Sequence, residues 1–453
     1  MARTRKKSYL PTEHFLFTAQ AGLWDMQQSP YMINHLYLLA EKVRLTKNCS
    51  QKIHRIGEDM ICKLSDIVNT ANTGADAIKK APILNEPTNL RCLRIGDVSQ
   101  KRDFSMWGYT KTSKMDYERY KLHKGDSIIA RTGNTIGVCT YIEDDIESVY
   151  NNGLIRLTAK KELARERFLF YLIRSTACQD YIQSIAYGTS TQPNMKIKDF
   201  LNFDIIVPTL EIQDKIIAIV DKIEKKIQVN TEINNNLLEQ ALTMYAMQFA
   251  TLDRNGYIGD YCSVKSGFAF KSSWWTTAGV KVIKIVSINQ DNLNLLECSY
   301  VDADKIDKAK DFKVNAGDLL IAMTGATIGK FAMVPYSSEL LLVNQRVGKF
   351  FLGNNPVKKL PFIYCTLKQP EVYCEVVNRG QGSAQPNISA SDIMSIPCVI
   401  PNQDAINDFN STAQPLFDLI ISNQRENQQL SKLRDTLLPK LMSGELDVSD
   451  IDL

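Results

Sequence analysis

The sequence has 453 residues, too many for one hydrophobic core, and its length predicts two to four domains. Charged residues make up 23% and hydrophobic residues 44%, a composition typical of an ordinary globular protein. The formal net charge of +4 permits a nucleic-acid partner without requiring one.

The ten cysteines and four histidines exclude a typical structural zinc site, because no cysteine pair has C-x-x-C spacing. The cysteines occur singly in apolar stretches, as free thiols do in a reducing cytoplasm. No run of 18 apolar residues is present, and the basic start of the chain lacks the apolar region of a signal peptide. We therefore expect a cytoplasmic protein with no metal site and no membrane contact.

The first 60 residues match no later part of the chain and are predicted to form an N-terminal extension. Within it, residues 29–45 predict an amphipathic helix that Ser29 and Pro30 would cap. Its apolar face comprises Ile33, Leu36, Tyr37, Ala40 and Val43. The helix could pack on the following domain or bind a partner subunit, and the basic residues 3–7 could contact DNA or only favour solubility.

A thirteen-residue segment occurs twice, as GDSIIARTGNTIG at 125–137 and GDLLIAMTGATIG at 317–329, with nine identical positions. Further matches follow at an offset of 193 residues. They pair STQPN (190–194) with SAQPN (383–387), and NTEINNNLLEQ (230–240) with NQRENQQLSKL (423–433). Because this period is too long for a solenoid, the chain after residue 60 is predicted to be a tandem duplication of one module.

Each module is predicted to begin with a β-rich α+β domain. Short apolar runs between Gly-Asp, Thr-Gly and Asn-Asn turn signals predict strands at 90–98, 127–131, 153–157, 280–288, 319–323 and 347–352. One apolar helix is expected in each module, near 166–181 and 360–377. The predicted parts are the extension (1–60), the first β-rich domain (61–208), a spacer helix (209–255), the second β-rich domain (256–401), and a second spacer helix with the C-terminal tail (402–453).

A heptad pattern follows each β-rich domain, with alternating steps of four and three residues. Its seam positions are Ile216, Val220, Ile223, Ile227, Asn230, Asn234, Leu237 and Ala241 in the first module, and Phe409, Ala413, Leu416, Ile420, Asn423, Asn427, Leu430 and Arg434 in the second. The paired asparagines indicate either a solvated stretch where the helices diverge or a layer that fixes the register of two antiparallel helices. Pro415 should kink the second helix or mark its start.

The expected fold is therefore α+β: two tandem-repeat β-rich domains separated by two long antiparallel helices, a coiled-coil spacer, with pseudo-twofold symmetry. About 30 helical residues rising 1.5 Å each make a rod of about 45 Å. Two similar domains at a fixed separation suit duplex DNA, in which half-sites one turn apart are separated by about 34–36 Å.

Several segments resemble a known family. SVKSGFAFKSS, GDLLIAMTGATIGKFAMVP, VNQRVGKFF, GSAQPNISASDIMSIPCVIP and the ending LSKLRDTLLPKLMSGELDV are similar to the DNA-specificity subunit of type I restriction-modification systems. The resemblance covers about residues 61–448 and is strongest in the second module; the first lacks the SGFAFKSS pattern. It implies two target-recognition domains, each recognising half of an interrupted double-stranded DNA site. It also implies two adenine-N6 methyltransferase subunits docked on the helices, and a restriction (translocase) subunit driven by ATP.

The two copies of the repeated segment differ at informative positions. The shared glycine, aspartate and threonine residues are those that a tight hairpin requires. Arg131 faces Met323 in the alignment, and Asn134 faces Ala326. These differences indicate either that the domains recognise different half-sites, which predicts a non-palindromic target, or that the copies have drifted neutrally.

Candidate DNA-contacting residues are basic or carry amide groups. Phosphate contacts are predicted for Arg102, Lys111, Lys114, Lys271, Lys281 and Lys330. Contacts to base edges are predicted for Arg131, Asn134, Gln192, Asn194, Gln385 and Asn387. The alternatives are a solvated charged face for the first set and a Pro-braced turn for the Gln-Pro-Asn segments of the second.

No catalytic motif is expected. The segment GATIGK (325–330) has one residue too few between its glycines for a phosphate-binding loop, and Phe331 follows the lysine. The chain has no Pro-Pro pair of an amino-methyltransferase loop and no H-E-x-x-H or G-x-S-x-G motif. We expect a non-catalytic subunit that binds no cofactor; the resemblance places S-adenosylmethionine, ATP and Mg²⁺ in partner subunits. The competing hypotheses are a stand-alone DNA methyltransferase or nuclease with an unrecognised site, and a protein-binding scaffold.

Overall fold

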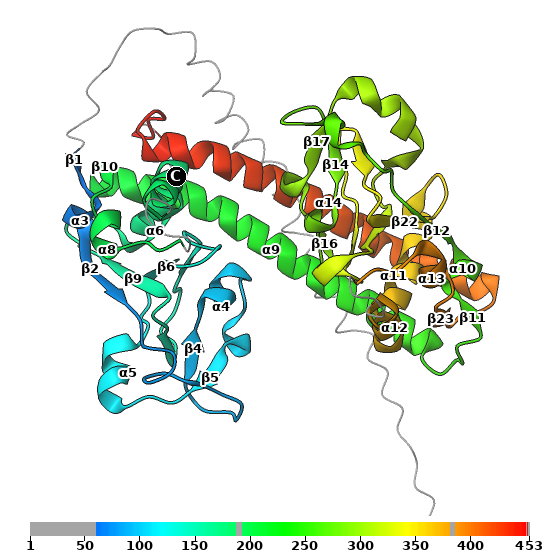
Figure 1. Cartoon of the computed structure of the whole chain (residues 1–453), viewed down its shortest axis with the longest axis horizontal. Coiled ribbons are helices and arrows are strands. Elements are labelled where there is room, and N and C mark those ends of the chain that lie inside the picture. Colours follow the sequence, from blue (N-terminus) through cyan, green and yellow to red (C-terminus); the bar gives the residue numbers. More distant parts are fainter. Residues whose placement is uncertain (1–59, 187–192, 381–385, 450, 452–453) are drawn as a thin grey trace, which may run out of the picture. The chain divides into compact units, whose positions relative to one another are not determined.

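The computed structural model describes residues 60–186, 193–380, 386–449 and 451 (Figure 1). The helix predicted at 29–45 and the basic segment at 3–7 lie outside these residues, as do Gln192 and Gln385. Packing divides the chain into two compact units. One contains the first β-rich domain, the chain up to Ile216 and the segment from Pro439, and the other is Ile217–Leu438.

Domain 1, the first β-rich domain, contains two four-stranded sheets. The antiparallel sheet has the order β2 (Val68–Thr73), β9 (Leu154–Ala159), β6 (Ser127–Ala130), β7 (Cys139–Tyr141). The mixed sheet has the order β3 (Ile83–Leu84), β5 (Gly108–Thr110), β4 (Arg91–Leu93), β8 (Ser148–Tyr150), and β4 runs parallel to β8. β1 (Met60–Lys63) pairs with β10 (Asp204–Val207), so the two ends of the domain meet.

Domain 2, the second β-rich domain, repeats this topology. Its antiparallel sheet has the order β12 (Ser263–Ser266), β22 (Val347–Phe351), β19 (Leu319–Ala322), β20 (Phe331–Met333). Its second sheet has the order β13 (Trp275–Thr276), β17 (Ser299–Val301), β14 (Val280–Ile283), β21 (Leu341–Val343), β18 (Lys313–Val314), with β14 parallel to β21. β11 (Gly256–Tyr257) pairs with β23 (Pro397–Cys398). The predicted α+β fold with two β-rich domains is confirmed.

The central strand β19 explains how these short sheets are stabilised. All four of its residues are buried. Because successive side chains of a strand point to opposite faces, Leu319 and Ile321 face the core that contains Phe362, whereas Leu320 and Ala322 face a second core with Leu341. Each domain is thus layered, with the antiparallel sheet between a helical layer and the second sheet (Figure 1).

Two sequence predictions of local structure are wrong. The helix expected near 166–181 is two helices, α6 (Glu166–Arg174) and α7 (Thr176–Ala186), and that expected near 360–377 is α11 (Leu360–Lys368) and α12 (Pro370–Gly380). Ser175 and Gln369 interrupt them with extended backbone, in the second case because Pro370 disfavours a helical conformation of the preceding residue.

The strands expected at 90–98 and 280–288 are also shorter than predicted. Each ends after four residues or fewer, and the chain then forms the helical turn α4 (Ile95–Ser99) or η4 (Ile285–Ser287). Apolar residues continue through the turn, so hydrophobicity alone does not mark where the strand ends.

The two long helices are α9 (Leu210–Phe249) and α14 (Gln403–Met442), of 40 residues each, or about 60 Å at 1.5 Å per residue. Cross-helix hydrogen bonds join Asn230 to Asn427 and Asn234 to Asn423, so the helices run antiparallel. α14 begins at Gln403, so Pro415 lies inside the helix and does not mark its start. Phe409, Ala413 and Phe417 are fully buried around it, and this packing offsets the hydrogen bond that the proline lacks.

Gly74 in domain 1 and Gly267 in domain 2 both lie where the backbone of another strand passes very close. A methyl group on Gly74 would lie 2.2 Å from the carbonyl oxygen of Tyr150, and one on Gly267 would lie 2.4 Å from that of Val343. We predict that Gly74→Ala destabilises domain 1 and Gly267→Ala destabilises domain 2, each by about 1–3 kcal/mol. Hydrogen exchange should rise in the strands of the altered domain only.

Gly96→Ala is the control, because no atom lies within 4 Å of the added methyl group and the backbone there needs no glycine. It should change stability by less than about 0.5 kcal/mol. Equal effects of all three substitutions would contradict the assigned close approach.

Candidate nucleic-acid interface

The repeated Thr-Gly segment forms a β-hairpin in both domains. In domain 1 it connects β6 to β7, and in domain 2 it connects β19 to β20. Gly133 and Gly325 at the tips have φ of 79° and 71°, a left-handed conformation that favours glycine. Open space surrounds Gly133, so backbone conformation rather than crowding requires the glycine there.

The aspartate shared by the two hairpins is structural. The Oδ2 atom of Asp126 accepts a hydrogen bond from the His123 amide at 2.8 Å, and that of Asp318 accepts one from the Asn315 amide at 2.7 Å. Both aspartates are 2% exposed, and burial raises the pKa of each carboxyl group. In domain 2, Nζ of Lys349 lies 2.6 Å from Asp318 Oδ2. These groups stabilise the hairpin base and are not available to a ligand.

Each hairpin tip pairs with the proline and asparagine of the Gln-Pro-Asn motif. The Gly133 amide donates to the Pro193 carbonyl at 3.1 Å, and the Gly325 amide donates to the Pro386 carbonyl at 3.0 Å. Asn194 pairs with Thr132 in an isolated antiparallel bridge, as Asn387 does with Thr324. The tertiary structure therefore joins two sets of candidate residues that lie about 60 positions apart in the sequence.

The side chains presented by this frame differ between the domains. In domain 1, Nη2 of Arg131 donates to Oδ1 of Asn194 at 3.1 Å, and Asn134 is exposed at the tip. In domain 2, Met323 replaces the arginine and is buried, and Ala326 is the exposed tip residue. Asn387 is exposed in domain 2 as Asn194 is in domain 1. Domain 1 thus presents a polar cluster, whereas the corresponding surface of domain 2 is more apolar.

The basic candidates divide into exposed and partnered side chains. Lys111, Lys114 and Lys271 are exposed, with Lys114 at the first position of α5 (Lys114–Tyr120), and Lys330 is half-buried. Nη1 of Arg102 lies 3.1 Å from the buried Asp97 carboxylate, and Lys281 forms an ion pair with Glu339. Arg102 and Lys281 would therefore have to leave these partners to neutralise a phosphate.

Two further cations, outside the candidate phosphate and base contacts, lie over aromatic rings. The Arg91 guanidinium lies 4.2 Å from the centroid of Tyr109, and Lys284 Nζ lies 3.7 Å from that of Trp275. Partial burial lowers the pKa of Lys284. The alternating cations of LRCLRI (90–95) and VKVIKI (280–285) were the available sequence signal, because they occur at matching places in both modules.

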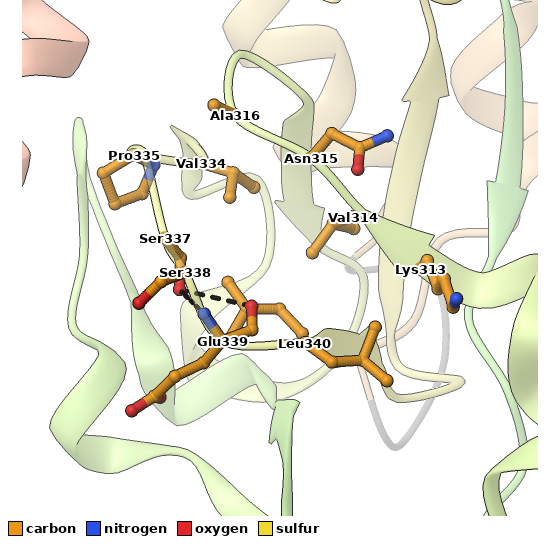
Figure 2. Close-up of a pocket in the computed structure, with 11 residues that line it drawn as sticks. Lys313, Val314, Asn315, Ala316, Val334, Pro335, Ser337, Ser338, Glu339 and Leu340 are labelled. Atoms are coloured by element: carbon orange, nitrogen blue, oxygen red, sulfur yellow. Dashed lines mark hydrogen bonds between the residues drawn. The ribbon is translucent and has the colours of Figure 1, made fainter.

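Domain 2 also has a surface pocket of about 330 Å³ at the edge strand β18 (Figure 2). Its lining consists of residues 313–316 and segments of 334–341, and the Ser337–Glu339 turn at its rim is closed by hydrogen bonds. None of the candidate DNA-contacting residues lines it. The pocket is therefore separate from the hairpin surface.

The seam asparagines form a hydrogen-bonded layer between α9 and α14. Asn230 Nδ2 donates to Asn427 Oδ1 at 2.9 Å, and Asn423 Nδ2 donates to Asn234 Oδ1 at 2.9 Å. Asn230 is 1% exposed and also contacts Glu426 Oε2 at 2.6 Å. The helices therefore remain in contact at this layer and do not diverge there. That the layer fixes the register of the helices stays a prediction.

Among the residues that the structure describes, neither a membrane-spanning helix nor a cluster of metal ligands is found. Within 60–186, 193–380 and 386–449, no helix combines the length and apolar character needed to cross a bilayer. Over the same ranges, no three His, Cys, Asp or Glu side chains gather as metal ligands would.

Comparison with known proteins follows the same division of the chain. The family described as "Type I restriction modification DNA specificity domain" matches twice, over residues 58–239 and 255–432. The chain is 26% identical over 330 residues to the type I restriction enzyme MjaIX specificity subunit of Methanocaldococcus jannaschii, covering 66% of this chain and 73% of that one.

A second relative and a solved structure cover more of the chain. The HindI specificity subunit of Haemophilus influenzae is 21% identical over 405 residues, covering 72% of this chain and 87% of that one. The crystal structure of a type I restriction-modification S subunit from M. genitalium aligns with a TM-score of 0.49 at 14% identity, covering 88% of this chain and 99% of that one.

The asparagine layer generates a testable prediction. Asn230→Ala should lower the free energy of unfolding of the helix pair by about 1–3 kcal/mol, because Asn427 and Glu426 lose their buried donor. Hydrogen exchange along α9 and α14, measured at increasing urea concentration, would report the change.

The exposed Asn235 on the same helix supplies the matched control, since Asn235→Ala removes the same side chain from a solvated position. It should be nearly neutral. If both alanine variants unfold alike, the buried layer contributes nothing specific. The double variant Asn230→Leu with Asn427→Leu should regain part of the stability, because the Asn230–Asn427 pair is removed together while Glu426 still lacks its donor.

Proposed function

The chain belongs to the type I restriction-modification DNA specificity family and is the DNA specificity subunit of such a system. We propose that its two domains recognise the two halves of a bipartite, asymmetric DNA sequence. As a specificity subunit it is non-catalytic and carries two target-recognition domains. The resemblance noted in the sequence is therefore confirmed at the level of the family.

One observation carries the proposal of an asymmetric target: the two domains share a backbone frame but present different side chains on it. The hairpin, the Pro carbonyl contact and the Asn bridge recur in both. Arg131 and Asn134 are matched by Met323 and Ala326. Arginine and asparagine form paired hydrogen bonds with guanine and adenine edges, which methionine and alanine cannot form. Two domains with these surfaces favour different base sequences.

The proposed partners are double-stranded DNA, two adenine-N6 methyltransferase subunits and restriction (translocase) subunits. In this assembly S-adenosylmethionine, ATP and Mg²⁺ belong to the partners, and this chain contributes sequence selection. The exposed Lys111, Lys114 and Lys271 support a phosphate-binding role, because each cation near the duplex releases counterions from DNA.

We further propose that α9 and α14 act as the spacer that sets the gap between the half-sites. A helix pair is stiff along its axis, and hydrogen bonds such as Asn230–Asn427 oppose sliding of one helix past the other. The number of helical residues would then determine the number of base pairs in the gap between the half-sites.

Exchanging domain 1 tests the modular proposal. Replacing residues 61–208 with the corresponding domain of another specificity subunit, with the partner subunits present, should change one half of the methylated motif and leave the other half and the gap intact. Sequencing methylated adenines in the genome of cells with the native or exchanged chain gives the result. A change in both halves, or in neither, would contradict the proposal.

The same complex separates DNA recognition from a protein-scaffold role. DNA binding through several phosphate contacts gives an affinity that falls steeply as salt rises, whereas a scaffold that binds only protein gives no such dependence. Absence of salt-dependent DNA affinity in the complex of chain and methyltransferase subunits would reject the proposed function.

Shortening both helices by one heptad tests the spacer. Deleting residues 219–225 together with the opposing residues 432–438 preserves the asparagine layer and shortens the pair by about 10 Å. The gap in the methylated motif should shrink by about three base pairs, while both half-sites stay unchanged. Alanine substitution of the exposed residues in the same heptads keeps the length and should keep the gap. An unchanged gap in the deletion variant would refute the spacer role.

A further inference from the structure

Domain 2 exposes two large apolar side chains on adjacent turns. Val286 is 57% exposed in η4, and Leu296 is 69% exposed in η5 (Leu295–Glu297). We call these two residues the apolar tip of domain 2. Single exposed apolar residues are common, but two on neighbouring turns form a patch that a partner could cover.

The turns that carry the apolar tip are tied to each other. The Ser287 hydroxyl donates to the Glu297 carbonyl at 3.2 Å, and the Asn294 amide donates to the Ser287 carbonyl at 2.8 Å. The Asn294 side chain in turn accepts a hydrogen bond from the Leu296 amide at 3.1 Å. Ser287 itself is fully buried. Val286 and Leu296 are therefore held in place by a hydrogen-bonded platform.

The platform continues the hairpin surface of domain 2. A methyl group on Gly325 at the hairpin tip would lie 4.0 Å from Cδ1 of Ile285, the residue that precedes Val286. The Gly325 amide also binds the carbonyl of Pro386, next to Asn387. The apolar tip, the hairpin and the candidate Asn387 thus belong to one continuous part of the domain.

Domain 1 builds the same platform with other residues. α4 takes the place of η4, with Gly96 where domain 2 has Val286, and η2 (Phe104–Met106) takes the place of η5 before strand β5. Met106 is 61% exposed there. Ile95 packs near the backbone of Gly153, whose carbonyl accepts from the Arg131 amide at 3.0 Å. Both domains therefore expose an apolar side chain on this platform.

The side chains of the two platforms differ, and this difference favours DNA over a protein subunit as the partner. A surface that bound two copies of one protein subunit would keep the same side chains in both domains. Here Gly96 corresponds to Val286, and the sequence Phe-Ser-Met corresponds to Leu-Leu-Glu. Surfaces that share a backbone but vary in side chains are those expected of contacts to different base sequences.

We propose that Val286 and Leu296 contact the C5-methyl groups of thymine in the major groove of the half-site bound by domain 2. The methyl group is the only apolar feature that a base pair presents in that groove, and aliphatic side chains recognise it by contact. This inference rests on the proposed function and adds to it the base chemistry recognised by domain 2. It requires at least one A·T pair in that half-site.

Deoxyuridine substitution tests the contact without altering the protein. The probe is a duplex carrying the motif found by methylation sequencing, with each thymine of the domain 2 half-site replaced in turn by deoxyuridine, which lacks only the methyl group. At one or more positions the complex of the chain with its methyltransferase subunits should bind about fourfold more weakly, the factor expected for losing burial of one methyl-sized group. The same replacement at a thymine in the gap between the half-sites should have no effect.

Variants link that loss to the apolar tip. With Val286→Ser and Leu296→Ser combined, affinity for the thymine duplex should fall, and deoxyuridine should cause no additional loss, because the methyl group no longer has an apolar partner. Met106→Ser is the control: it removes the exposed apolar side chain from the corresponding turn of domain 1 and should leave the thymine dependence of the domain 2 half-site intact.

The outcomes separate this inference from the proposed function. If the native complex methylates a bipartite motif but no deoxyuridine weakens binding, or if the domain 2 half-site has no A·T pair, the thymine contact is wrong and the proposed function stands. If the Val286 and Leu296 variant keeps its DNA affinity but loses methyltransferase subunits, the tip is a protein contact instead. If the native complex shows neither motif nor salt-dependent DNA binding, the proposed function itself fails.

Discussion

Backbone hydrogen bonds between the hairpin and the Gln-Pro-Asn segment hold the candidate recognition surface of each domain together. The amide of Gly133 binds the carbonyl of Pro193, and that of Gly325 binds the carbonyl of Pro386. These bonds join a hairpin tip to a segment from the far end of the same domain, so two loops become one surface. Each tip needs a left-handed glycine, which explains why the glycines recur while neighbouring side chains differ.

The constant frame allows the chemistry of each surface to vary independently of the fold. In domain 1 the frame supports a polar pair, Arg131 with Asn194, whose donors and acceptor suit base edges. In domain 2 the equivalent Met323 turns into the core, Ala326 is exposed at the hairpin tip, and Val286 and Leu296 are exposed on the platform that Ile285 links to the hairpin. A duplicated module can in this way acquire two specificities without changing the packing that stabilises it.

The long helices combine an apolar seam with a polar interruption. Buried residues such as Ile223 and Ile420 supply the packing, while the asparagine layer adds hydrogen bonds between the helices. A shift by one turn would leave buried amide groups without partners, at a cost of about 1–3 kcal/mol each. In the proposed spacer, this cost would favour one register of the two helices.

The sequence by itself determined the duplication, the β-rich domains, the heptad seams and the family, because repeats, turn signals and periodicity are local patterns. It did not predict the breaks at Ser175 and Gln369 or the ends of β4 and β14, where apolar residues continue through a change of structure. Only the tertiary structure decided that Arg131 meets Asn194, that Arg102 and Lys281 already have acidic partners, and that Ile285, next to the exposed Val286, lies near the hairpin tip of domain 2. Such contacts depend on which distant segments the sheets bring together, and no spacing along the chain records them.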